Sequence, residues 1–196
     1  MLKKSNQLLH QSRHARLFYF WRMNERISIA TAEDIAQLVQ LINSAYRGES
    51  SKQGWTTEAD LLDGIRTDEE SLKELMTKKD SVVLKYVEGS KLIGCVNLQK
   101  QGDQLYLGML TVDPTLQTRG IGKQLLYNAE EYAKQEGCSA VVMTVITVRN
   151  ELLQWYQRHG YSLTGEKKPF PMNDPRFGLP KQDLEFFVLK KELTTA

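Results

Sequence analysis

Residues 107–135 read LGMLTVDPTLQTRGIGKQLLYNAEEYAKQ, a stretch that passes from an apolar strand through a glycine-containing turn into an amphipathic helix. The turn, QTRGIG, covers residues 117–122. Glycines at a helix start let the backbone approach a ligand closely, and the free N–H groups of the first turn, with the helix dipole, attract anions. Arg119 and Lys123 add positive charge at the same place. The stretch therefore predicts a site for phosphate or pyrophosphate.

Two better-known phosphate-binding loops do not fit this turn. A P-loop would need glycine where Gln117 stands and serine or threonine where Gln124 stands. A dinucleotide-binding fingerprint would need a third glycine where Leu125 stands. Judged on the turn alone, a glycine-rich helix start that binds nothing is the alternative.

The chain on either side of this stretch alternates between strands and helices. Apolar periodicity, turn residues and caps predict an α/β (α+β) fold around one central sheet. A polar, glycine-punctuated segment covers 46–68, and four of the five prolines lie between residues 169 and 180. The predicted strands are 26–30, 81–89, 91–100, 104–112, 139–148, 161–167 and 183–191, and the predicted helices are one capped by Thr31, then 57–64, 69–78, 120–136 and 151–159.

Composition bounds the class of protein. The chain has 196 residues, of which 41% are hydrophobic and 26% charged, so we expect one globular domain with a substantial core. A net charge of +2 gives no reason to expect nucleic-acid binding. Cys95 and Cys138 form neither a disulfide framework nor a metal site, so we expect buried thiols and no metal. No apolar run approaches the roughly 20 residues needed to cross a bilayer, and we expect a cytoplasmic protein without membrane association.

The small net charge hides an uneven distribution. Residues 1–24 carry five basic and no acidic side chains, which leaves the remainder of the chain at −3. We treat 1–24 as a basic N-terminal extension and 25–196 as the domain. A targeting or membrane-surface segment, a helix packed on the domain, and a start site assigned upstream of Met23 remain open. The acidic domain is compatible with a cationic acceptor.

Two motifs carry a resemblance to a known family. Gln117-x-x-Gly120-x-Gly122, after a strand ending Leu110-x-Val112-x-Pro114, resembles the acyl-CoA-binding motif of the GNAT superfamily of N-acetyltransferases. In the second half, Asn150 opens a helix that ends Tyr156-x-x-x-Gly160-Tyr161, which is similar to the family's Tyr-x-x-x-Gly-Tyr/Phe ending. The resemblance covers about residues 26–191, and segment 46–68 resembles an uncharacterised microbial branch of the family.

The resemblance implies a GNAT fold: a mixed, mostly antiparallel sheet of six to seven strands with helices on both faces. Its fourth and fifth strands, here 104–112 and 140–148, would run parallel and splay apart around acetyl-CoA, the co-substrate. Backbone at Leu110 and Val112 would pair with the pantetheine arm, and an amide near Met109 or Leu110 would polarise the thioester. Asn150 would hydrogen-bond the arm. The pyrophosphate would be held by the backbone amides of Gln117, Thr118, Arg119, Gly120, Ile121, Gly122 and Lys123.

The same resemblance implies that Tyr156 protonates the departing thiolate. An acceptor amine of pKa about 10.4 must lose a proton before it attacks, so a base is also needed. Many family members carry a glutamate on the strand equivalent to 104–112, but this strand offers no carboxylate. An ordered water, Tyr106, or a carboxylate from 58–63 are the candidates, with Glu58 and Asp60 bordering the acceptor.

Each candidate also has a purely structural interpretation. Tyr156 could be a core residue, Asn150 a helix cap, and Glu58 and Asp60 part of a solvated helix face. We expect His159 to be a C-terminal cation of its helix. The function expected from the sequence is N-acetyl transfer to the primary amine of a small molecule in a ternary complex. Acetylation of protein N-termini or lysines, and a non-catalytic acyl-CoA-binding domain, are the alternatives, and a homodimer is compatible with the resemblance.

Overall fold

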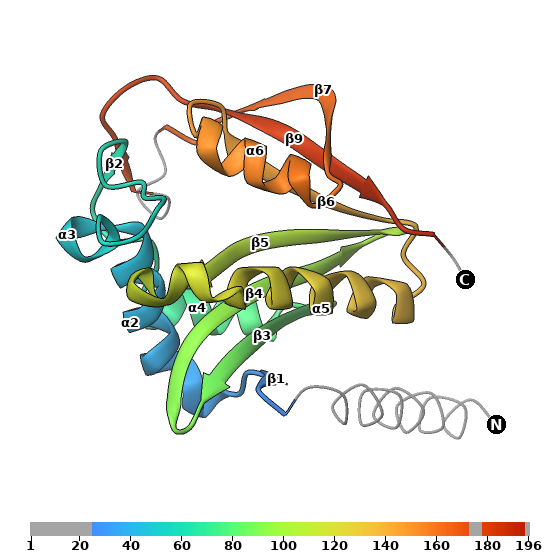
Figure 1. Cartoon of the computed structure of the whole chain (residues 1–196), viewed down its shortest axis with the longest axis horizontal. Helices are drawn as coiled ribbons and strands as arrows, with labels where there is room; N and C mark the ends of the chain where they lie inside the picture. The colour runs from blue at the N-terminus through green and yellow to red at the C-terminus, as the bar shows by residue number, and fades with distance from the viewer. Residues whose placement is uncertain (1–24, 173–177, 195–196) are drawn as a thin grey trace.

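The computed structural model describes residues 25–172 and 178–194, and its centre is a seven-stranded sheet in the order β1-β3-β4-β5-β6-β9-β7 (Figure 1). Every neighbouring pair is antiparallel except β5 and β6, which confirms the predicted mixed sheet. The expected extension 1–24 lies outside the described residues. The strands of this sheet are β1 (Ile27–Ile29), β3 (Ser81–Glu88), β4 (Lys91–Gln101), β5 (Gln104–Val112), β6 (Ala140–Ile146), β7 (Ser162–Pro169) and β9 (Glu185–Glu192).

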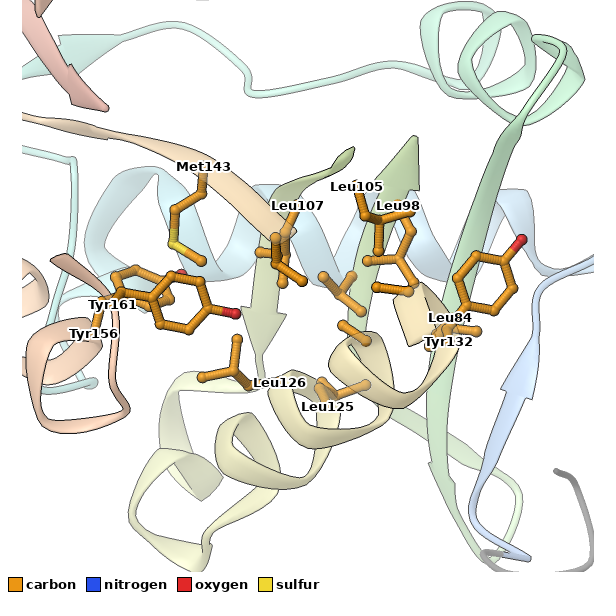
Figure 2. Close-up of a cluster of buried hydrophobic side chains, with 14 of the residues drawn as sticks. Leu84, Leu98, Leu105, Leu107, Leu125, Leu126, Tyr132, Met143, Tyr156 and Tyr161 are labelled. Atoms are coloured by element: carbon orange, nitrogen blue, oxygen red, sulfur yellow. The ribbon is translucent and has the colours of Figure 1, made fainter. Parts of the chain in front are cut away.

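Helices cover both faces of the sheet, because successive side chains of a strand point to opposite sides. On β3, Leu84 packs in the cluster that contains α5, whereas its neighbour Val83 packs with α2 and α4. Figure 2 shows the first cluster, in which Leu125 and Leu126 of α5 face strand residues such as Leu98, Leu105 and Leu107. The helices are α2 (Ile35–Tyr46), α3 (Gly48–Ser51), α4 (Glu69–Thr77), α5 (Ile121–Gln135) and α6 (Asn150–Arg158), with 3-10 turns η1 (Ala32–Asp34) and η2 (Pro114–Arg119).

Strands β5 and β6 pair over only three residues. The parallel ladder joins Gln104–Tyr106 to Ala140–Val142 and then stops, and the two strands diverge (Figure 1). On the other side of β5, the register with β4 shifts where Met109 and Leu110 together face Val96. Met109 has a φ of 55°, an uncommon value for a residue with a side chain. The bulge and the short ladder together produce the splayed strands expected from the sequence.

The predicted helix over 57–64 is wrong. The amides of Leu61 and Leu62 bond to the Glu58 carbonyl, which makes one turn only. The chain then forms β2 (Leu62–Asp63), which pairs with β8 (Leu179–Pro180) in a separate two-stranded sheet. Pairing with a distant strand, and ion pairs that hold Glu58, override the local helical pattern.

The other predicted helices and strands are present with small shifts at their ends. Asp68 caps α4 by accepting a hydrogen bond from the Ser71 amide (2.7 Å), and Gly137, with a φ of 71°, follows α5. Cys95 and Cys138 are both buried thiols, as predicted. Part of the proline-dense segment, residues 173–177, lies outside the described residues. Of its described part, Phe170 is buried against Leu62, Ile146 and Leu184.

Candidate active site

A cavity of about 1030 Å³ occupies the space where β5 and β6 diverge. Its walls come from both faces of the sheet: the start of α5 and the side of α6 on one side, and α2 and α4 on the other. The predicted site residues that line it are Glu58, Tyr106, Met109, Leu110, Val112, Gln117, Thr118, Gly120, Gly122, Lys123 and Tyr156. Asp60, Arg119, Ile121 and Asn150 are not among the lining residues.

The turn before α5 has the geometry of an anion site. Gly120 adopts a left-handed conformation (φ 76°) between η2 and α5. The first amide that bonds within the helix is that of Gln124, to the Gly120 carbonyl (3.1 Å), so the amides of Ile121, Gly122 and Lys123 are left for another partner. Lys123 lies at the cavity, but the Arg119 guanidinium is bound to both carboxylate oxygens of Glu88 (2.9 Å each). Of the two predicted cations, Lys123 is the one that lines the cavity.

Gly122 leaves room beside this turn. A Cβ built at Gly122 would lie 3.7 Å from Val112 Cγ2 and 3.8 Å from Trp155 Cζ2, which is ordinary contact. An alanine would therefore fit, whereas a large side chain would extend into the space between β5 and α6. This opening joins the turn to the divergence of the two strands.

Tyr156 is both a buried residue of the core and a lining residue of the cavity. Its ring is 5% exposed and packs edge-on against Trp155 and Tyr161, at centroid distances of 5.0 and 5.8 Å. Among the described residues, none forms a hydrogen bond with its hydroxyl, and the residue lines the cavity. Burial raises the pKa of Tyr156, so the phenol is protonated at neutral pH, as an exposed tyrosine is, and is a weaker acid than one.

Glu58 lies in the cavity wall between two arginines. Its carboxylate accepts hydrogen bonds from Arg47 Nη1 (2.6 Å) and Arg149 Nη1 (2.8 Å), and all three side chains are less than 10% exposed. Both carboxylate oxygens are therefore occupied by arginine donors, Oε2 by Arg47 and Oε1 by Arg149. Asp60 is exposed, with Lys52 Nζ at 3.8 Å. The structure therefore brings one of the two predicted acidic residues to the cavity.

The segment that carries Glu58 bonds to two elements on one side of the cavity. The Trp55 amide donates to Gln117 Oε1 in the turn before α5 (3.0 Å), and the Thr56 hydroxyl donates to Glu151 at the start of α6 (2.8 Å). The approach at Gly54 is close: a Cβ there would lie 2.4 Å from Gln117 Oε1. Segment 54–58, called the strap below, thus joins the turn before α5 to the start of α6.

The cavity wall near α2 and the bulge of β5 contains residues that the sequence did not single out. The Tyr46 hydroxyl donates to the Leu110 carbonyl at the bulge of β5 (3.2 Å), and the Arg66 guanidinium lies 5.4 Å from the centre of the Tyr46 ring. The Tyr106 hydroxyl shares a hydrogen bond with Thr144 Oγ1 (2.9 Å). Tyr46 and Arg47 are consecutive at the end of α2, Arg66 and Arg149 come from distant segments, and no local motif marks any of them.

Other features of the described residues narrow the chemistry. His159 forms a hydrogen bond through Nδ1 with the Trp155 carbonyl (2.8 Å) and its ring lies 4.2 Å from that of Trp155. Within 25–172 and 178–194, no cluster of three or more potential metal ligands occurs. In the same ranges, every helix is too short or too polar to span a membrane.

Comparison with known proteins gives one sequence match and many structural ones. The profile described as "Acetyltransferase (GNAT) family" matches residues 35–161. No curated protein sequence matches the chain. Similar solved structures include the ribosomal-protein-S18-alanine N-acetyltransferase of Escherichia coli, with 14% identity over 87% of this chain and 94% of that chain and a TM-score of 0.64.

Two further solved structures have comparable likeness. The IAA acetyltransferase of Bacillus cereus is 19% identical over 85% of this chain and 98% of that one, with a TM-score of 0.61. The PaiA N-acetyltransferase of Thermoplasma acidophilum, solved with coenzyme A, is 20% identical over 85% and 98%, with a TM-score of 0.60. At these identities the likeness shows a shared fold.

Proposed function

The chain belongs to the GNAT family of acetyltransferases, and from this premise we propose that it transfers acetyl from acetyl-CoA to a primary amine of a small molecule. Members of this family are acyl-CoA-dependent N-acetyltransferases, so the protein is an enzyme of that class. The observation that carries the proposal is the cavity at the divergence of β5 and β6, which is lined by Tyr156 and by residues of the turn 117–122 before α5, the phosphate turn of this proposal.

The residues present fit acetyl-CoA. The free amides at the start of α5 and the Lys123 ammonium suit a pyrophosphate, and the space beside Gly122 admits a thin chain between β5 and α6. Beyond its three-residue ladder with β6, the β6-facing edge of β5 offers backbone groups near Leu110 and Val112 to the pantetheine arm, while its other edge pairs with β4. Binding supplies an activated thioester at the bulge of β5. An amide near Met109 or Leu110 would stabilise the developing oxyanion, an interaction worth about 3–4 kcal/mol in other enzymes.

Proton transfer in this proposal uses two positions. Tyr156 supplies the proton to the leaving sulfur, since the residue lines the cavity and its hydroxyl has no hydrogen-bond partner among the described residues. The base is an ordered water or Tyr106, whose hydroxyl is linked to Thr144 at the cavity wall. Glu58 is a less suitable base because both of its oxygens are bound by arginines. The contact of Asn150 with the pantetheine arm stays a prediction, and the residue is exposed at the first position of α6.

A small acceptor is favoured over a peptide by the way the cleft is covered. The strap 54–58 joins the phosphate turn to α6, and Phe170, which follows β7, and Phe186 of β9 line the cavity. A peptide acceptor would need an open groove. Acetylation of protein N-termini or lysines is therefore the second candidate, and a non-catalytic acyl-CoA-binding domain is the third. The cytoplasmic location and the homodimer also stay predictions.

The proposal is tested by thiol release from acetyl-CoA across amines, amino acids, polyamines and aminoglycosides, with peptides in parallel arms. We expect release with at least one small amine and mass-spectrometric detection of its N-acetyl product. Acetylation of peptides alone would reverse the choice of acceptor. Binding of acetyl-CoA by calorimetry without thiol release in any arm would favour the non-catalytic alternative.

A further inference from the structure

The end of the cavity between α2 and α4 holds an arginine that forms no ion pair with any described residue. Arg66 lines the cavity, and none of the carboxylates in the described residues lies within 4.0 Å of its guanidinium. The nearby Glu58 is already shared by Arg47 and Arg149. This end of the cavity therefore carries excess positive charge, opposite in sign to the net charge of the domain.

The backbone of Arg66 is fixed in position. Asn43 of α2 accepts hydrogen bonds from the amides of Arg66 (2.7 Å) and Thr67 (3.1 Å), and it donates to the Thr67 carbonyl (2.8 Å). The Arg66 guanidinium lies over the Tyr46 ring, which orients it without consuming its N–H donors. The guanidinium is therefore held at the cavity by a fixed backbone and by the Tyr46 ring.

Arg66 also lies close to the expected reaction centre and away from the phosphate turn. The ring that it covers belongs to Tyr46, whose hydroxyl bonds to the Leu110 carbonyl at the bulge of β5. The loop of Arg66 leads into α4, on the face of the sheet covered by α2 and α4, whereas the phosphate turn leads into α5 on the opposite face. The anion that Arg66 would meet therefore belongs to the acceptor.

We propose that Arg66 binds a carboxylate of the acceptor, so that the substrate class is an amine that also carries a carboxylate, such as an amino acid. This inference rests on the proposed function and narrows it. A planar guanidinium presents paired donors that match a carboxylate, and Lys at the same place would supply charge without that fork. Binding the carboxylate at Arg66 would leave the amine of the acceptor directed toward the thioester.

The test compares matched acceptors and matched variants. Each of several amino acids is assayed beside its amide, which keeps the amine and side chain but removes the negative charge. We expect kcat/KM to favour the amino acid by about 10- to 100-fold, the range of a charged hydrogen bond, mainly through KM. Arg66→Gln should remove this preference, Arg66→Lys should retain part of it, and the KM for acetyl-CoA should not change in either variant.

Lys73→Gln serves as the control, because it removes one positive charge, as Arg66→Gln does. Lys73 is exposed on α4 and does not line the cavity. Equal use of amino acid and amide by the wild-type enzyme, or a preference that Arg66→Gln leaves intact, would overturn the inference and leave the proposed function standing. A fall in kcat/KM for both acceptors alike would assign Arg66 a structural role and also overturn it. Transfer to peptides only, or no transfer to any acceptor, would overturn the proposed function itself.

Discussion

The Tyr46 hydroxyl donates a hydrogen bond to the Leu110 carbonyl across 3.2 Å, from α2 to the bulge of β5. This contact ties the helix that borders the acceptor end of the cavity to the strand segment that leaves the sheet ladder. Burial raises the pKa of Tyr46 to about 12, so the phenol remains a donor at every pH at which the enzyme would be assayed. Met109, one residue before Leu110, holds the strained φ of 55° that the bulge requires.

Tyr46→Phe should loosen the bulge without opening a large cavity. Losing this one hydrogen bond is expected to lower the free energy of unfolding by about 0.5–1.5 kcal/mol, with a further cost if the Leu110 carbonyl finds no water. Turnover should fall, because the amide near Leu110 is no longer held in place. Urea denaturation and thiol release measure the two effects. Tyr127→Phe is the control, since Tyr127 is exposed on α5, and equal stabilities of the two variants would contradict the assignment.

The parts of the fold that could be predicted from the sequence are those that local patterns determine. The apolar face of α5, the turn with Gly120 and Gly122, and the run of apolar residues in β6 each follow from the residues within one element. Their placement in the sheet follows from the family resemblance. For this reason the turn before α5 can be located from the sequence, whereas the contact of each of its residues with a pyrophosphate stays a prediction.

The acceptor side could not be predicted because its contacts join distant segments. Glu58 meets Arg149, 91 positions away, and this pairing helps to convert a segment with a helical pattern into a single turn followed by β2. Tyr46 meets Leu110 across 64 positions. Arg66 has no motif around it, and only the position of Asn43 shows that its loop is fixed. Side chains of this kind acquire their roles from tertiary contacts that no spacing rule encodes.

Tyr156→Phe should separate proton donation from binding. The ring packing against Trp155 and Tyr161 is retained, so the fold and the affinity for acetyl-CoA should not change. The departing thiolate loses its acid, and general acid catalysis contributes about 10²- to 10⁴-fold to rates in other enzymes. We therefore expect kcat to fall by about this factor. Steady-state kinetics and calorimetry measure the two quantities, and turnover equal to that of the wild type would remove Tyr156 from the mechanism.

Gly122→Trp should abolish binding of acetyl-CoA by filling the space between Val112 and Trp155. Gly122→Ala is the matched control, because its Cβ would make only ordinary contacts at 3.7–3.9 Å. Alanine should also stabilise the first turn of α5 by about 0.5–1 kcal/mol relative to glycine. Titration calorimetry with CoA gives the affinities. Full affinity in the tryptophan variant would show that the ligand does not pass this position.

Glu58→Gln should strongly destabilise the protein, because it leaves the buried guanidinium groups of Arg47 and Arg149 without their shared carboxylate. Breaking a buried ion pair by removing one partner costs about 3–5 kcal/mol. Asp60→Asn, two residues away and exposed, should stay within about 0.5 kcal/mol of the wild type. Chemical denaturation followed by circular dichroism compares the two. If Glu58→Gln lowered the free energy of unfolding no more than Asp60→Asn does, the ion pairs of Glu58 with Arg47 and Arg149 would contribute little to stability.

The free energy of unfolding should decrease in alkaline solution, because burial raises the pKa of the Cys95 thiol. Burial raises its pKa from 9.0 to about 12, so the folded protein keeps a proton that the unfolded chain releases near pH 9. Below that pH both states hold the proton and the stabilisation is fully present. Between about pH 9 and 12 each rise in pH favours the unfolded chain, and Tyr46 acts in the same direction from its ordinary value of 10.0.

The measurement is the free energy of unfolding at several pH values from about 8 to 11, under reducing conditions, for the wild type and Cys95→Ala. The variant should be less stable at about pH 8, because it leaves a small cavity between α2 and the sheet. Its stability should nevertheless fall less steeply as the pH rises, since one of the groups whose pKa is raised by burial is gone. Identical slopes in the two proteins would mean that the Cys95 thiol ionises as readily in the folded state as in the unfolded chain.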